Sequence, residues 1–257
     1  MRRIFEQLPY FLPAEPAPFA RLFLTEGIRR EVAKGELLKR GGESQRLFFL
    51  ESGLCAYYAA EAENHRPTIL SVLLPGRAMG DLTASVGTRC NVFTRALEKS
   101  VVRVVPPAVL TAALMKDPAL AQLAIRSVIA KEESILEGMT ANFIRPPAER
   151  IVICAKALCR AENVSPSGGW HRLPLTISAE RIGEIVNLNR VSVARQLSSW
   201  MKADLVRRDG RKLLFSDRLF AAVDDWIENP VPKCPLPAQT SNGSEVMRPR
   251  SRLSLAE

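Results

Sequence analysis

The chain has 257 residues, of which 47% are hydrophobic and 25% are charged. These values are typical of a globular protein with one large domain or two smaller ones. No stretch reaches the roughly 18 consecutive apolar residues of a membrane-spanning helix. Thirty-six basic and 27 acidic residues give a net charge of +9, so polyanions are the first class of partner to consider.

The first residues and the cysteines indicate a cytoplasmic protein. Glu6, Gln7 and Pro9 interrupt the start of the chain, so no signal peptide is expected. The five cysteines are odd in number and scattered, which argues against a disulfide scaffold and favours a reducing compartment. They are Cys55, Cys90, Cys154, Cys159 and Cys234.

Residues 29–105 have the pattern of short strands. Apolar runs at 47–50, 68–74 and 100–105 are separated by turn residues. Recurring glycines predict tight turns between them, at positions 35, 41, 42, 53, 76, 80 and 87. We therefore expect an α+β protein whose residues 1–116 form a small antiparallel barrel or jelly roll.

A long helix is predicted over 117–145. Pro106, Pro107 and Pro118 fit helix starts, and no proline follows until Pro146. Apolar side chains recur at alternating steps of four and three, which predicts a dimerisation helix, although a helix packed on its own domain would give a similar pattern. The row comprises Ile125, Ile129, Glu132, Leu136, Met139 and Phe143, with Glu132 expected at its rim.

The pair Pro146-Pro147 predicts a hinge, because the residue before a proline is disfavoured in the α conformation. A DNA-binding domain is expected at 146–228, and its segment 146–215 carries 12 basic and 6 acidic residues. Residues 229–257 are rich in Pro and Ser and have no apolar period, so a disordered tail is predicted there.

Residues 177–217 contain the pattern of a helix-turn-helix. Ser178 can cap the first helix and Asn189 the second, because their side-chain oxygens can accept from free N–H groups. Asn187 lies where the chain must turn sharply, and asparagine tolerates the left-handed conformation. The buried sides are predicted to be Ile182, Ile185 and Val186, then Val193, Leu197 and Trp200 or Met201.

The second helix and a following hairpin carry the predicted DNA contacts. Arg190, Ser192 and Arg195 lie on the outward N-terminal side, where arginine can pair with guanine and serine can reach a phosphate. Asp209-Gly210 predicts a two-residue type I′ hairpin turn. Basic residues at its tip would contact the phosphate backbone as a wing: Arg207, Arg208, Arg211 and Lys212.

Three segments resemble the Crp/Fnr regulators. IGEIVNLNRVSVARQLSSW followed by LVRRDGRKLLF resembles their winged helix. VAKGELLKRGGESQRLFFLESG and LLPGRAMGDL resemble their β-roll, and the helix before Pro146 matches their dimer helix in place and length. The resemblance implies a homodimer that binds a two-fold symmetric operator and RNA polymerase, with the β-roll sensing a signal.

The effector site departs from that family. Its cyclic-AMP-binding members hold the cyclic phosphate with a Gly-Glu and an Arg-Ser pair, and a phosphate without that arginine loses a strong contact. Their Thr-Ser pair on the dimer helix corresponds to Ile135 and Leu136 here. We therefore expect cyclic AMP not to be the effector. The candidate ligand-binding residues at the matching positions are Gly80, Asp81, Asn91 and Val92.

Further departures concern the operator and the cofactor. The family's common glutamate in the recognition helix is Val191, which can contact a thymine methyl but cannot accept from cytosine. No cysteine precedes Cys55, so an iron–sulfur cluster is not expected. The cysteines are predicted to be buried apolar residues, with a redox switch at Cys55 or Cys90 as the less favoured alternative. His65 and His171 are expected in surface loops, and haem ligation by them is unsupported.

No metal site and no enzymatic activity are expected, because the sequence lacks HExxH, GxSxG and the phosphate loop GxxxxGK[ST]. The alternative function is a ligand-binding regulatory module whose DNA binding is weak or lost. Salt distinguishes the two, because DNA binding weakens steeply with ionic strength.

Overall fold

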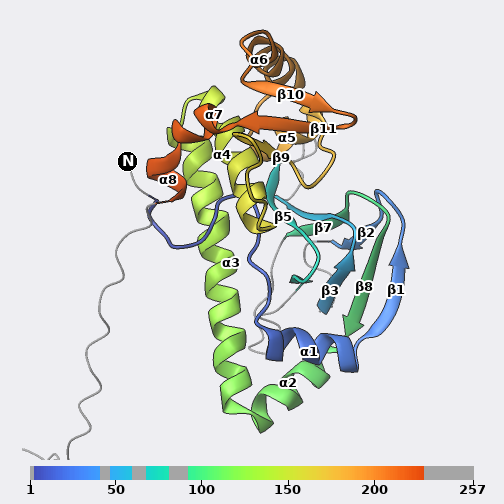
Figure 1. The fold of residues 1–257 in the computed structure, drawn as a ribbon. Coiled ribbons are helices and arrows are strands. Elements are labelled where there is room, and N and C mark those ends of the chain that lie inside the picture. The colour runs from blue at the N-terminus through green and yellow to red at the C-terminus, as the bar shows by residue number, and fades with distance from the viewer. Residues whose placement is uncertain (1–2, 41–46, 60–67, 81–91, 229–257) are drawn as a thin grey trace, which may run out of the picture.

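The computed structural model describes residues 3–40, 47–59, 68–80 and 92–228 (Figure 1). Its first half contains α1 (Ala17–Glu26), β1 (Ile28–Val32), β2 (Leu37–Lys39), β3 (Leu47–Ser52), β4 (Cys55–Tyr58), β5 (Ile69–Leu73), β6 (Ala78–Gly80), β7 (Phe93–Ala96) and β8 (Ser100–Val105). Its second half contains α2 (Pro107–Lys116), α3 (Pro118–Ile144), α4 (Pro147–Ala161), β9 (Trp170–Arg172), α5 (Ala179–Ile185), α6 (Arg190–Lys202), β10 (Val206–Asp209), β11 (Lys212–Ser216), α7 (Asp217–Ala221) and α8 (Asp224–Ile227). The predicted tail, 229–257, lies outside the described residues.

The N-terminal half is the predicted β-roll. Two four-stranded antiparallel sheets, ordered β1-β8-β3-β6 and β2-β7-β4-β5, contribute to a shared core. That core includes Leu38, Phe48, Leu50, Leu73 and Val102, all of them buried. The three predicted apolar runs are β3, β5 and β8, so the α+β jelly-roll prediction is confirmed.

A tight turn between β3 and β4 depends on Gly53. Its φ of +95° is in the left-handed region, which favours glycine. A Cβ there would also lie 2.3 Å from Ser100 Oγ. This hydroxyl accepts from the Leu54 backbone N–H, so the glycine allows the turn to close on β8.

Two helices that flank the β-roll cover one of its sheets. In α1, Phe19 and Phe23 are buried, and the Phe23 ring stacks on Phe49 of β3 with centroids 5.6 Å apart. Leu110 of α2 joins the same cluster. The sequence predicted helix starts at Pro106–Pro107 and Pro118, which the structure confirms, but α1 was not predicted.

The long helix α3 has an unusual distribution of side chains. Asp117 caps it by accepting from the N–H groups of Ala119 and Leu120. The face that packs on the rest of the chain is largely polar and contains Ser127, Lys131, Ser134 and Glu137. The solvent face contains the predicted apolar row, with exposed fractions of 60% at Ile125, 52% at Ile129, 44% at Leu136, 52% at Met139 and 88% at Phe143. Glu132, also exposed, lies in this row.

The polar face of α3 holds an N-terminal arm, residues 3–12. Ser134 Oγ donates to the carbonyl oxygens of Leu8 (2.8 Å) and Phe11 (3.0 Å). Glu137 Oε1 accepts from the Phe5 backbone N–H at 2.5 Å. Polar α3 side chains are buried here because they form hydrogen bonds with the backbone N–H and C=O groups of the arm, an irregular segment that has few backbone partners of its own.

Tyr10 joins the arm to three other parts of the fold. Its φ is +69°, and Phe11 N donates to Pro9 O across it, which is the rare and strained γ-turn. Its hydroxyl donates to Asn142 Oδ1 at 2.9 Å, and Asn142 Nδ2 donates to Ile185 O at the end of α5 (3.0 Å). This relay connects the arm, α3 and the helix-turn-helix.

Glu137→Gln is expected to stabilise the protein at neutral pH. Burial raises the pKa of the Glu137 carboxyl, and its Oε2 has no hydrogen-bond partner among the described residues. A carboxyl whose pKa is raised by folding contributes most stability below its unfolded pKa and loses it as pH rises. The variant should therefore gain about 1 kcal/mol at pH 7 and nothing below about pH 4, measured by urea unfolding. An equal gain in stability at both pH values, or a gain in the exposed Glu98→Gln control, would show that the buried charge of Glu137 is not the cause.

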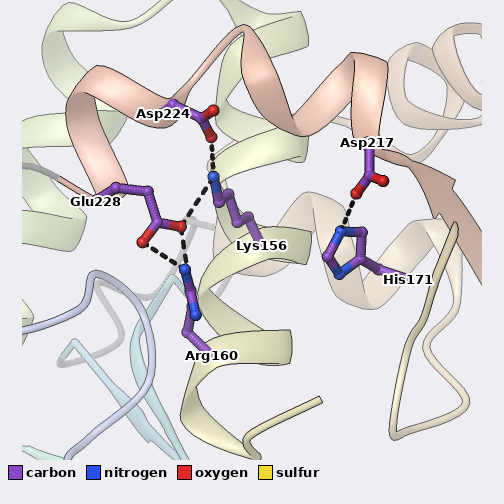
Figure 2. A network of polar contacts seen from close by, with 6 residues as sticks. All are labelled: Lys156, Arg160, His171, Asp217, Asp224 and Glu228. Atoms are coloured by element: carbon purple, nitrogen blue, oxygen red, sulfur yellow. Dashed lines mark hydrogen bonds and ion pairs between the residues drawn. The ribbon is translucent and has the colours of Figure 1, made fainter. Parts of the chain in front are cut away.

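The C-terminal helices are fixed by ion pairs (Figure 2). On α4, Lys156 pairs with Asp224 and with Glu228 (3.0 Å), and Arg160 Nη2 lies 2.5 Å from Glu228. Buried Trp226 of α8 packs under Arg145, whose guanidinium lies 4.3 Å from the ring centroid. Arg145 and Pro146 are the two residues between α3 and α4, so the predicted break at 145–146 is present and lies against α8.

Two arginines join the β-roll to the C-terminal half. Arg77, before β6, donates to Ala161 O at 3.2 Å and lies 3.3 Å from Glu162 at the end of α4. Arg181 of α5 donates to the Tyr58 hydroxyl at 3.0 Å and also pairs with Glu184. The helix-turn-helix is therefore docked on the β-roll.

Candidate nucleic-acid interface

The helix-turn-helix forms as predicted. Ser178 Oγ accepts from Arg181 N (3.1 Å), and Asn189 Oδ1 accepts from Ser192 N (2.8 Å), so both caps are made. Asn187 has a φ of +51°, the left-handed conformation predicted for the turn. A Cβ at Gly183 would lie 2.5 Å from Leu188 O, so the turn packs this closely on α5 only because residue 183 is glycine.

The two helices bury the predicted apolar sides. Ile182, Ile185 and Val186 are buried on the first side, and Val193, Leu197 and Trp200 on the second. The opposite face of α6 is open to solvent: Val191 is 63% exposed, and Arg190 and Arg195 are exposed too. Three of the α6 residues that the sequence assigned to DNA are thus exposed, whereas the fourth, Ser192, is half-buried.

The hairpin turn lies one residue later than predicted. Asp209 pairs with Lys212, so the central residues of the turn are Gly210 and Arg211 rather than Asp209 and Gly210. Gly210 has a φ of +57° and Arg211 does not have a positive φ, which fits a type II′ turn and not type I′. The error arose because Asp-Gly was read as the turn itself, whereas Asp209 is the last ladder residue of β10.

The basic residues of the hairpin fall into two groups. Arg207 donates twice to Asp204 at 2.7 Å and lies 4.1 Å above the Trp170 ring, and Lys212 Nζ donates to Pro174 O at 2.6 Å. Their charged groups are thus engaged within the fold. Arg208 and Arg211 are exposed and form no ion pair with any described residue, and the same holds for Arg190 and Arg195 of α6.

A groove of about 860 Å³ separates α6 from the hairpin. Arg190 and Ser198 line it from α6, and Arg208 and Arg211 line it from the other side. Ser178 also lines it. Three arginines outnumber the one carboxylate of the lining, Glu180, so the groove is net positive, which favours a phosphate backbone.

A second site lies between the β-roll and α3. A pocket of about 190 Å³ is lined by two of the four predicted ligand-binding residues, Gly80 and Val92, while Asp81 and Asn91 lie outside the described residues. Ile135 also lines it. The sequence did not identify the other polar residues of the lining: Lys39, Tyr57, Thr94, Lys131 and Glu132.

Lys131 is 4% exposed and forms an ion pair with buried Glu15. Burial lowers the pKa of its ammonium, and Glu15 partly offsets the shift. Glu15 also accepts from Ala78 N at 2.9 Å and from Ser127 Oγ at 2.5 Å. A cation is thus held beside the pocket by a carboxylate that α3 and β6 fix in place.

The described cysteines are buried, as predicted. Cys55, Cys154 and Cys159 are free thiols, and burial raises the pKa of Cys55 and of Cys159 to about 12 and that of Cys154 still further. Thiols in this state react slowly, which disfavours a redox switch at Cys55. Cys90 and Cys234 lie outside the described residues.

The prediction for His171 was wrong, and His65 lies outside the described residues. His171 belongs to strand β9 and is largely buried, with Nε2 2.5 Å from Asp217 Oδ1 and its ring against Phe220 (Figure 2). Its pairing with Phe215 of β11 is a long-range contact, so the local sequence looked like a loop. Within the described residues, no three His, Cys, Asp or Glu side chains group as a metal site would require.

Comparison with known proteins agrees with this architecture. Residues 29–117 match the sequence model of the Cyclic nucleotide-binding domain family. No curated protein matches the sequence. No helix of the described residues is long and apolar enough to span a membrane.

Several solved structures have a similar fold. FixK2 from Bradyrhizobium japonicum is 17% identical with a TM-score of 0.65, over 76% of this chain and 96% of FixK2. The c-di-GMP responsive global regulator CLP of Xanthomonas campestris is 16% identical with a TM-score of 0.64, over 78% of this chain and 99% of CLP. A CRP-family transcriptional regulator from Thermus thermophilus is 19% identical with a TM-score of 0.61, over 78% and 97% of the two chains. The chain thus contains a domain of the cyclic nucleotide-binding family and has the overall fold of Crp/Fnr-type transcription regulators.

Proposed function

We propose that the protein is a sequence-specific DNA-binding transcription regulator that acts as a homodimer on a palindromic operator. The observation that carries this proposal is the exposed face of α6 with its adjoining groove. Arg195 is exposed on α6, and Arg190, Arg208 and Arg211 line the groove; none of the four forms an ion pair with a described residue, whereas the neighbouring Arg207 is engaged. RNA polymerase is the further partner expected of such a regulator.

The apolar row of α3 supports the dimer. Five large apolar side chains lie exposed along one face of a 27-residue helix, while its polar face is buried. A soluble monomer rarely leaves so long an apolar stripe uncovered. Packing α3 against the same helix of a second copy would cover it and would present two α6 helices to half-sites about 34–36 Å apart.

A signal can reach α6 through contacts that already exist. Glu132 belongs both to the pocket lining and to the apolar row, so a ligand there would alter the dimer seam. The Tyr10–Asn142–Ile185 relay and the Arg181–Tyr58 hydrogen bond then connect α3 and the β-roll to α5. Either signal-dependent or abundance-dependent control is compatible with this arrangement.

Arg195→Ala is expected to cost about 1–3 kcal/mol in binding to the operator and little in binding to unrelated DNA. Arg208→Ala provides the matched control, because loss of a phosphate contact weakens binding to both DNAs about equally and reduces the salt slope by about one. Fluorescence anisotropy with operator and scrambled duplexes measures the affinity of each variant for the two DNAs. Unchanged operator affinity in Arg195→Ala would show that α6 is not the reading helix.

The alternative, a ligand-binding module with weak or lost DNA binding, is tested by salt. A DNA-binding dimer that neutralises several phosphates should lose affinity steeply between about 50 and 200 mM salt. A ligand module would not bind duplex DNA at either concentration.

A further inference from the structure

The N-terminal arm is folded compactly at residues 3–7. Arg3 is 5% exposed, and its Nη1 donates to two carbonyl oxygens of the same segment at 3.0 and 2.9 Å. Glu137 holds this segment on α3 by accepting from the Phe5 backbone N–H. The arm therefore buries an arginine, yet it leaves the large apolar side chain of Ile4 52% exposed.

Three consecutive residues of α3 show where the arm lies relative to the apolar row. Successive side chains of a helix are turned by about 100°, so Ile135 and Glu137 lie on opposite sides of exposed Leu136. Glu137 is buried under the arm, whereas Ile135 packs against the core of the β-roll. We call these two sides of the row the arm flank and the roll flank. Half-buried Val128, seven residues before Ile135, continues the roll flank.

The arm flank has an apolar centre and an acidic edge. Ile4 adjoins Phe5, the residue that is bonded to Glu137. Burial, and then the nearby Glu6 carboxylate, raise the pKa of the Glu133 carboxyl, so these two acidic groups lie close together. An apolar residue beside the row with charged residues around it has the anatomy of a protein interface, in which a polar rim surrounds an apolar centre.

Two-fold symmetry brings unlike flanks together. The α6 helices of both copies can reach the same face of DNA only if the two α3 helices are parallel. In a parallel pair, the flank on one side of each apolar seam faces the opposite flank of the other helix. From this geometry we infer that the N-terminal arm is part of the dimer interface. Ile4 of each protomer contacts the roll flank of its partner, at the level of the partner's Ile135.

This inference rests on the proposed homodimer and extends it beyond α3. The arm adds an apolar contact on each side of the seam, so the interface includes residues from the start of the chain as well as the long helix. The Tyr10–Asn142–Ile185 relay connects the same arm to α5. Each helix-turn-helix is thereby linked, through its own arm, to the α3 helix of the other protomer.

Cysteine cross-linking of the full chain tests this contact. The double variant Ile4→Cys/Ile135→Cys, treated with a short bismaleimide, should give a covalent dimer on a denaturing gel. Each single variant should give almost none, because like flanks lie on opposite sides of a parallel pair. The pair Leu24→Cys/Ile135→Cys is the matched control, since Leu24 is 43% exposed but belongs to α1.

The native thiols do not interfere with this experiment. Cys55, Cys154 and Cys159 are buried and react slowly. Cys90 and Cys234 lie outside the described residues, so every chain also carries serine at these two positions.

Ile4→Glu measures how much the arm contributes to the dimer. A carboxylate placed in the contact should raise the dimer dissociation constant about tenfold in analytical ultracentrifugation. Leu24→Glu adds the same charge at an exposed apolar position away from α3, so its dissociation constant should equal that of the parent. Circular dichroism should show both variants folded, because neither side chain is buried in the protomer.

Three results would overturn the inference while the protein remains a dimer. They are no covalent dimer from Ile4→Cys/Ile135→Cys, a covalent dimer from Ile4→Cys alone, which would bring the two arms together, or an unchanged dissociation constant in Ile4→Glu. Any of them leaves the proposed dimer and its DNA binding intact. A parent protein that is monomeric in the ultracentrifuge would instead overturn the proposed homodimer, and this contact with it.

Discussion

Leu136→Glu is expected to convert the protein to a monomer and to weaken operator binding by about 100-fold or more. Leu136 lies in the middle of the exposed apolar row of α3, between Glu132 and Met139. A second carboxylate in a seam that already contains Glu132 would face its own copy and would be desolvated in the dimer. Loss of the dimer removes the avidity of two half-sites, which is worth about 10²–10⁴ in affinity.

Analytical ultracentrifugation measures the oligomeric state of the variant, and fluorescence anisotropy measures its affinity for the operator. The control is Ala119→Glu, which adds the same charge to an exposed position of α3 that does not continue the row. Circular dichroism should show both variants folded, because neither side chain is buried in the protomer. A Leu136→Glu protein that remains dimeric with full operator affinity would rule out this face of α3 as the interface.

Lys131→Met is expected to lower the free energy of unfolding by about 3–5 kcal/mol. Lys131 is the cation that compensates Glu15, whose side chain is fully buried and is also fixed by Ala78 N and Ser127 Oγ. Removing one partner of a buried ion pair leaves the other charge unpaired, which costs far more than the pair itself contributes.

The double variant Glu15→Gln/Lys131→Met distinguishes the effect of the unpaired charge on stability from the effect of lost packing. A glutamine side chain at position 15 keeps the shape of the glutamate and can still accept from Ala78 N, so most of the lost stability should return. Urea unfolding of the parent, both single variants and the double variant closes the cycle. If Lys131→Met costs less than about 1 kcal/mol, the ion pair does not hold α3 to the β-roll.

The helix-turn-helix was predictable because its determinants are local. Ser178, Asn187 and Asn189 each act within three residues of their own position, as caps or as a turn residue. The apolar row of α3 was predictable for a related reason, since its spacing alone defines a face. The sequence could not show that the opposite face would be polar and buried, because this depends on the N-terminal arm.

The residues missed by the sequence depend on long-range pairing. Lys39, Thr94 and Tyr57 come from three strands and become neighbours only through the register of the sheet. Lys131 lies beside them because α3 crosses the same sheet, and its partner Glu15 is 116 positions away in the chain. His171 looked like a surface residue for the same reason, since β9 exists only through its pairing with β11.

The sequence pattern of the hairpin did not show which of its basic side chains are engaged within the fold. Four basic side chains at its tip were assigned to phosphates on composition. Trp170 and Asp204 engage Arg207, and Pro174 engages Lys212, through contacts that span up to 38 positions. Arg208 and Arg211 line the groove, so we expect the wing to contact phosphates through these two.

Selection of binding sites from random duplex DNA, with the purified full chain at moderate salt, tests the central claim most directly. The account predicts enrichment of an inverted repeat whose half-sites are one helical turn apart, with a thymine preference where Val191 meets the major groove. The selection is run without added ligand and then with pools of small molecules. Enrichment of no sequence under any of these conditions, with duplex DNA unbound even at about 50 mM salt, would contradict a DNA-binding regulator.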